Sequence, residues 1–134
     1  MIYLLDSNVW VVLLRGTKPQ VTARFRATPS ADLRVCSVIV AELRHGCARS
    51  AKSAANRAAV DALLAPYPSL PFDDAAVDSF VAIRMHLESL GIPIGPYDLQ
   101  IAAIALTNGC TLVTHNQAEF SRVPALLLED WETP

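Results

Sequence analysis

The sequence of 134 residues is poor in the patterns that mark several common classes of protein. Its three cysteines show no C-x-x-C spacing, and its three histidines form no H-E-x-x-H pattern. We therefore expect free, buried thiols and no thiolate or imidazole metal site. Asp6 and Asn8 interrupt the apolar stretch 2–14, which is far shorter than the roughly 18 to 20 residues of a membrane span. These absences predict a cytoplasmic protein without a membrane segment.

The chain is nevertheless rich in apolar residues, and its charges are unevenly distributed. A hydrophobic content of 52% and a net charge of -2 are typical of one globular domain, expected here over residues 1–134. No acid lies between Glu42 and Asp61, where four basic residues occur: Arg44, Arg49, Lys52 and Arg57. This basic segment is either the solvated face of a helical hairpin or a surface that contacts phosphates.

Strand and helix signals alternate along the chain. Strands are expected at 2–5, 33–36, 70–72 and 111–113, the first and the last of the buried kind. Helices are expected at 9–14, 38–49, 51–65, 74–90 and 97–108, with Ser7 or Asn8 capping the first, Ser37 capping the second, and Gly16, Gly91 and Gly109 closing helices. The alternation predicts an α/β domain with a parallel sheet covered by helices on both faces.

Four polar residues lie where the predicted strands end or the next helices begin: Asp6, Glu42, Asp98 and Asn116. Each has a structural interpretation of its own. The two aspartates suit helix caps, Glu42 suits an ion pair with Arg44 or a place on the surface, and Asn116 suits a turn. In an open α/β sheet, however, the carboxyl ends of the strands share one edge, where ligands bind. The four side chains are therefore expected to meet.

Three carboxylates at one sheet edge repel one another unless a cation lies between them. Oxygen ligands from Asp, Glu and Asn suit the hard ions Mg²⁺ and Mn²⁺, which also accept phosphate oxygens. The pattern predicts metal-assisted hydrolysis of a phosphodiester, with Asp6, Glu42 and Asp98 as metal ligands and Asn116 as a fourth, weaker contributor.

Four segments carry a family resemblance that spans essentially the whole chain: LLDSN, AELRHG, PIGPYDLQIAAIAL, and LVTHNQAEF followed by VPALLLEDW. They resemble the PIN-domain ribonucleases, and among these the VapC toxins of VapBC toxin–antitoxin modules. The resemblance implies a three-layer, flavodoxin-like α/β/α fold and a homodimer. It also implies a VapB-type antitoxin whose C-terminal arm blocks the site, and an RNA substrate, which for some similar toxins is transfer RNA.

By this resemblance Asp6, Glu42 and Asp98 match the three acids of the family's metal site. The sequence departs from the family pattern at two positions: Ser7 stands where Thr is common, and Asn116 stands where many PIN domains have a fourth Asp. Glu119 either supplies the missing charge or points to solvent. The expected supporting residues are Ser7, Asn8, Thr114 and Glu119. Since Arg44 follows Glu42 on one predicted helix, the resemblance favours RNA contact by the basic segment.

Two other classes of protein compete with this interpretation. A receiver domain or other phosphoryl-transfer enzyme also places an acid after the first strand, but Asn8 breaks its D-x-D signature and no G-x-x-x-x-G-K-[ST] loop is present. The second is a non-catalytic PIN-like module that binds protein or DNA. The presence of all three acids argues against it, although a fold alone does not establish a function.

Overall fold

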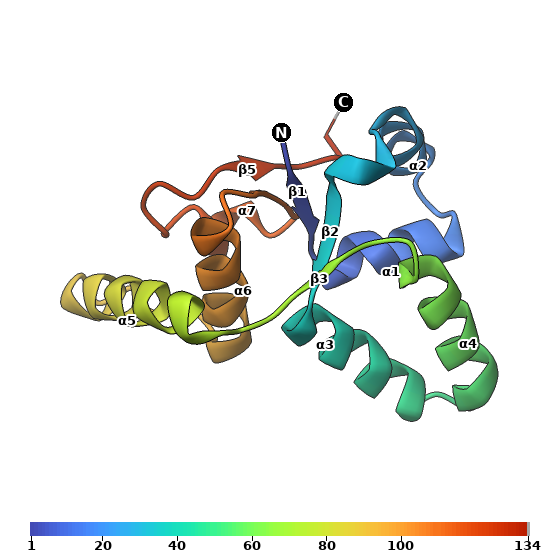
Figure 1. Ribbon diagram of the computed structural model, residues 1–134, viewed down its shortest axis with the longest axis horizontal. Coiled ribbons are helices and arrows are strands. Elements are labelled where there is room, and N and C mark those ends of the chain that lie inside the picture. The colour runs from blue at the N-terminus through green and yellow to red at the C-terminus, as the bar shows by residue number, and fades with distance from the viewer. Residues whose placement is uncertain (134) are drawn as a thin grey trace.

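The computed structural model describes residues 1–133, which form a parallel five-stranded sheet between two layers of helices (Figure 1). Across the sheet the order is β3-β2-β1-β4-β5. The strands are β1 (Tyr3–Leu5), β2 (Leu33–Cys36), β3 (Ser69–Leu70), β4 (Thr111–Val113) and β5 (Leu128–Glu129). The strand order reverses between β1 and β4, so the carboxyl edge there is the expected position for a ligand. The predicted three-layer α/β/α architecture is confirmed.

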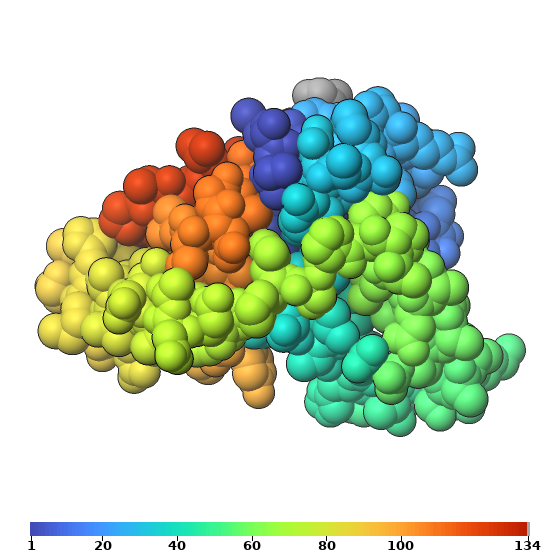
Figure 2. Space-filling view, in the orientation of Figure 1, coloured from blue at the N-terminus to red at the C-terminus, as the bar shows by residue number. Residues whose placement is uncertain are grey.

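Helices α1 to α4 lie on one side of the sheet and α5 to α7 on the other (Figure 1), and the segment that joins α4 to α5 crosses the front of the molecule between them (Figure 2). Their bounds are α1 (Ser7–Arg15), α2 (Pro19–Ala27), α3 (Ser37–Ala48), α4 (Ser53–Leu64), α5 (Asp74–Ser89), α6 (Pro96–Thr107) and α7 (Gln117–Phe120). A single 3-10 turn at Ser30–Asp32 precedes β2. The sequence prediction lacked α2, α7 and β5, and its strand at 70–72 starts one residue and ends two residues later than β3.

The predicted helix starts need correction at two places. The N-cap of α1 is Asp6 rather than Ser7 or Asn8, because the Asp6 carboxylate accepts the Ser7 N–H at 2.8 Å. Ser37 is the first residue of α3 and makes no capping hydrogen bond, and Cys36 occupies the cap. The predicted helix ends are confirmed: Gly16, Gly91 and Gly109 all have positive φ, a conformation that glycine adopts without strain.

The core fills the space between the sheet and both helical layers. Leu4, Leu5 and Trp10 are fully buried, and the Trp10 indole N–H donates to the Leu5 carbonyl at 3.0 Å. The Trp10 ring also packs against Phe25 of α2 and Tyr67, which holds α1 and α2 close to the sheet.

The three cysteines, Cys36, Cys47 and Cys110, are buried and free, as predicted. In the part of the chain that the structure describes, no helix has the length and apolar character to cross a membrane.

Candidate active site

Asp6 lies directly after β1 and is held by both of its carboxylate oxygens. Oδ1 accepts the Ser7 N–H, and Oδ2 accepts the Thr114 hydroxyl at 2.8 Å. Thr114 is itself buried and follows β4, the neighbouring strand. Burial raises the pKa of Asp6, although these hydrogen bonds oppose the rise. Asp6 is therefore a buried, oriented carboxylate at the point where the strand order reverses.

Glu42 approaches from α3, where its neighbour Leu43 packs in the core. Its Oε1 atom is buried and has no hydrogen-bond partner among the described residues. Burial raises the pKa of Glu42, and the charge of Asp6 adds to the rise. A buried carboxylate oxygen without a donor is unfavourable by itself, so Glu42 lacks the partner that would balance its desolvation.

Asp98 lies in the first turn of α6, on the other side of the sheet from Glu42. Burial is the largest cause that raises its pKa to about 7. The charge of Glu119 and a hydrogen bond with its carboxyl group contribute next, followed by the charges of Asp6 and Glu42. Helices α3 and α6 flank the end of β1 (Figure 1), and the charges of Asp6 and Glu42 act on Asp98, so the three predicted acids lie within electrostatic reach of one another. Their ligand atoms do not all lie within 4.8 Å of one another in the described residues.

Asn116 and Glu119 occupy the segment after β4. The Asn116 backbone N–H donates to the Thr114 hydroxyl at 3.0 Å, so this segment is tied to the residue that holds Asp6. The Asn116 side-chain amide donates to Glu119 Oε2 at 3.0 Å. Glu119 Oε1 also accepts the Gly95 N–H at 2.8 Å, so its carboxylate faces the start of α6, contrary to the solvent-facing alternative. Ser7 is half-buried and Asn8 is exposed.

The donor set fits a divalent cation on three grounds. The site offers only oxygen ligands, which suit Mg²⁺ or Mn²⁺. One carboxylate oxygen, Glu42 Oε1, is buried without a donor. In addition, the acids raise one another's pKa, so a positive charge between them would relieve both desolvation and repulsion.

The fold and the acids at the sheet edge match a known protein family. A family model described as "PIN domain" matches residues 3–126. The chain belongs to the PIN-domain family. The family resemblance inferred from the sequence motifs is confirmed.

Relatives of this PIN domain match it over nearly the whole length. It is 32% identical to "Ribonuclease VapC2" of Rickettsia felis, over 98% of this chain and 99% of the relative. It is also 32% identical to "tRNA(fMet)-specific endonuclease VapC" of Salmonella typhimurium, over 96% of this chain and 97% of the relative. A solved DNA-bound VapBC complex from S. typhimurium superposes with a TM-score of 0.91 at 30% identity, over 98% of each chain.

A groove of about 690 Å³ lies between α1, α3 and α4 of this PIN domain, and of the three predicted acids Glu42 lines it. Its lining also includes Ser7, Asn8 and apolar side chains such as Val11 and Val60. Two arginines line it, Arg15 of α1 and Arg49 at the end of α3. Arg15 was absent from the predicted RNA contacts because no periodicity links the end of α1 to the basic segment.

The four predicted basic residues differ in their partners. Arg57 donates to Asp61 at 2.9 Å, and Arg44 lies 3.6 Å from the same carboxylate. Within residues 1–133, Arg49 and Lys52 form no ion pair. The spacing of Arg57 and Asp61, four residues apart on a helix, was a visible sequence signal for pairing. The unpaired residues are therefore the better candidates for phosphate contact.

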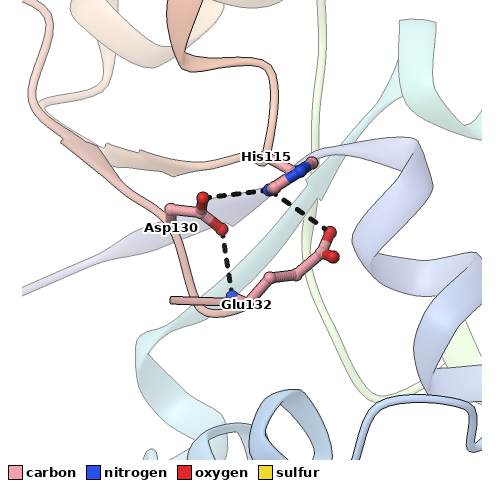
Figure 3. Close-up of side chains that lie close together, drawn as sticks. All are labelled: His115, Asp130 and Glu132. Atoms are coloured by element: carbon pink, nitrogen blue, oxygen red, sulfur yellow. Dashed lines mark hydrogen bonds and ion pairs between the residues drawn. The ribbon is translucent and has the colours of Figure 1, made fainter. Parts of the chain in front are cut away.

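A second group of ionisable side chains was not foreseen from the sequence. His115, Asp130 and Glu132 converge so that one ligand atom of each lies within 4.8 Å of the others (Figure 3). His115 Nδ1 is 3.0 Å from Asp130 and 3.7 Å from Glu132, and Lys18 pairs with Glu132 at 2.7 Å. This group could hold a metal ion by its donor types, but its atoms already have partners in the protein, unlike Glu42.

Proposed function

We propose that this PIN domain is a divalent-metal-dependent endoribonuclease, acting as the toxin of a VapBC-type toxin–antitoxin system in the cytoplasm. The observation that carries the proposal is the group of mutually repelling acids with the donor-free Glu42 oxygen. The full-length likeness to relatives named as VapC ribonucleases supports the same activity. Because one relative is named for cleavage of tRNA(fMet), transfer RNA is the proposed class of substrate.

Asp6, Glu42 and Asp98 would hold Mg²⁺ or Mn²⁺ in this proposal. A bound ion of this kind lowers the pKa of an attacking water and neutralises charge on the scissile phosphate. Thr114 and the Ser7 N–H keep the Asp6 carboxylate in one orientation through hydrogen bonds of 2.8 Å. Asn116 offers a neutral amide at the edge of the site, so its contribution to activity should be smaller than that of any acid.

RNA would enter along the groove beside Glu42. The arginines Arg15 and Arg49 line this groove, and Lys52 lies just beyond it at the start of α4. These side chains would contact phosphates on the nucleotides that flank the scissile bond. Arg44 and Arg57 remain proposed RNA contacts of lesser weight, because Asp61 already balances part of their charge.

Two protein partners belong to the proposal. A VapB-type antitoxin would insert its C-terminal arm into the same groove, consistent with the VapBC complexes among similar structures.

A second copy of this chain would cover α5, where Val77, Val81 and Met85 are exposed by 39%, 52% and 64% at four-residue spacing. Light scattering of Val81→Glu tests the homodimer: a variant that keeps the wild-type mass argues against this face.

An RNA cleavage assay separates the proposed enzyme from the alternative of a non-catalytic binding module. Purified, antitoxin-free protein is incubated with total transfer RNA, with Mg²⁺ or with EDTA, and Asp98→Asn is run in parallel. Cleavage that needs both the metal and Asp98 supports the ribonuclease. Cleavage in EDTA, or none of any RNA by the wild type, contradicts it.

A further inference from the structure

The Glu119 carboxylate joins two segments that are far apart in the sequence. Its Oε1 atom accepts the backbone N–H of Gly95 at 2.8 Å, and its Oε2 atom accepts the Asn116 side-chain amide at 3.0 Å. Gly95 caps α6, whereas Asn116 follows β4. Both oxygens of one half-buried side chain are thus engaged by donors of the protein. This contrasts with Glu42, whose buried Oε1 atom has no donor.

Gly95 is the residue from which α6 departs. It has no side chain that could cap the helix, and its carbonyl accepts the Leu99 N–H at 2.9 Å. Since Asp98 is in the first turn of α6, the position of Gly95 fixes where the Asp98 carboxyl group lies. The charge of Glu119 also acts on the Asp98 carboxyl group and raises its pKa. One side chain therefore contacts both the start of α6 and the segment after β4.

The segment after β4 is in turn connected to Asp6. Thr114 donates its hydroxyl to Asp6 and accepts the Asn116 backbone N–H. A continuous chain of hydrogen bonds consequently runs from Asp6 through Thr114 and Asn116 to Glu119, and from there to Gly95. Because carboxylate oxygens of Glu119 accept the Gly95 N–H and the Asn116 side-chain amide, these two hydrogen bonds are charge-assisted.

We propose that Glu119 is a positioning residue, which sets the distance between the Asp98 and Asp6 carboxylates by tying the start of α6 to the segment after β4. This role differs from a fourth acid that supplies charge to a metal. Its effect on cleavage depends on the proposed ribonuclease activity, whereas its effect on Gly95 does not.

Glu119→Gln and Glu119→Ala separate positioning from charge. The glutamine keeps an oxygen for Gly95, and after a flip of the Asn116 amide it can also bond that side chain, but it carries no charge. We expect Glu119→Ala to reduce kcat by about 10- to 100-fold with little change in KM for RNA, as for residues that orient metal ligands. Glu119→Gln should stay within a few-fold of the wild type. If glutamine is as harmful as alanine, the charge matters and positioning is wrong.

Amide hydrogen exchange of the metal-free protein gives a readout that needs no activity. Pro93 and Pro96 have no N–H, so Ile94 and Gly95 are the backbone amides that exchange between Ile92 and Tyr97. Loss of a charge-assisted hydrogen bond should speed Gly95 exchange by at least about tenfold in Glu119→Ala, and much less in Glu119→Gln. Equal Gly95 exchange in wild type and Glu119→Ala would overturn the proposal.

Glu88→Ala is the matched control, since Glu88 lies on α5 and pairs with Arg84 at 3.6 Å, both side chains being more than half exposed. It should change neither Gly95 exchange nor kcat. If the wild type proves not to cleave RNA while Glu119→Ala still accelerates Gly95 exchange, the proposed function fails and the positioning role stands. The two proposals can therefore fail separately.

Discussion

The carboxyl edge of the sheet and the C-terminal segment both gather acids, but their charges are balanced in opposite ways. At the sheet edge, burial and mutual repulsion raise the pKa of Asp6, Glu42 and Asp98. In the C-terminal segment, burial also acts to raise the pKa of Asp130, but hydrogen bonds from the Glu132 N–H, His115 and Thr133 lower it overall. The sheet-edge acids therefore keep a net repulsion, which marks the candidate site, whereas hydrogen bonds and ion pairs balance the acids of the C-terminal segment.

The fastening role of the C-terminal segment is visible in its contacts. Glu132 pairs with Lys18, and Glu129 accepts from Arg24 at 2.7 Å and from the Trp131 indole N–H at 3.0 Å. The Arg24 guanidinium also lies over the Trp131 ring at 5.3 Å. These contacts attach the end of the chain to the α1–α2 connection and to α2. Neutralising an acid should consequently have opposite effects on stability in the two regions.

The largest expected effect concerns the three sheet-edge acids. Asp6→Asn, Glu42→Gln and Asp98→Asn should each lower RNA cleavage by at least about 100-fold. Each variant loses a proposed metal ligand, and this loss should reduce activity more than the loss of a residue that only orients a ligand. In EDTA the same variants should melt at the wild-type temperature or above it, since the substitution relieves repulsion. Cleavage rates and thermal melts in EDTA check both effects. A large fall in melting temperature would make these acids structural.

The metal-free protein should also lose stability as the pH rises. The pKa of Asp98 is about 7 in the fold and 3.8 ordinarily, so between these values the folded state binds more protons than the unfolded chain. The free energy of unfolding therefore falls from about pH 4 to pH 7. Melting temperatures in EDTA should drop by several degrees, roughly, from pH 5 to pH 8, and less in Asp98→Asn. An equal fall in melting temperature in the wild type and in Asp98→Asn would show that Asp98 does not cause the pH dependence.

The distinction between paired and unpaired charges extends to the basic residues. Arg49→Ala with Lys52→Ala should weaken RNA binding and reduce the slope of log affinity against log salt by about 1.4 to 1.8, because two phosphate contacts are lost. The double variant Arg44→Ala with Arg57→Ala is the matched comparison and should change the slope less, since Asp61 shares their charge. Equal slopes for both variants and the wild type would indicate that the whole basic segment is a solvated face that does not contact phosphates.

The smallest expected effect is in the C-terminal segment. Glu132→Gln removes a partly exposed ion pair with Lys18, which should cost about 0.2–1 kcal/mol of unfolding free energy and leave cleavage unchanged. The loss should shrink at high salt, because screening already weakens the pair. Thermal melts at low and high salt check this. If Glu132→Gln is more stable than the wild type, neutralising an acid does not have opposite effects on stability in the two regions.

Much of the fold could be predicted because its signals are local. Apolar strands, helical stretches and the glycines that close three helices follow one another in the chain, and the PIN-domain motifs span it. The missed α2 buries only Val21 among its own residues, so its periodicity is weak, although Pro19 at its first turn was a usable signal. The missed β5 has two residues, too few for any period to show.

The sequence by itself determined which side chains are available at the sheet edge: Asp6 after the first strand, Glu42 and Asp98 near helix starts, and no competing cysteine or histidine motif. Only the tertiary structure decided how each charge is balanced. Thr114 reaches Asp6 across 108 positions, and Gly95 reaches Glu119 across 24. Strand order and side-chain rotamers decide such partners, because they bring residues that are distant in the sequence to within a few ångströms of each other. Local periodicity describes only neighbours along the chain, so it does not encode these contacts.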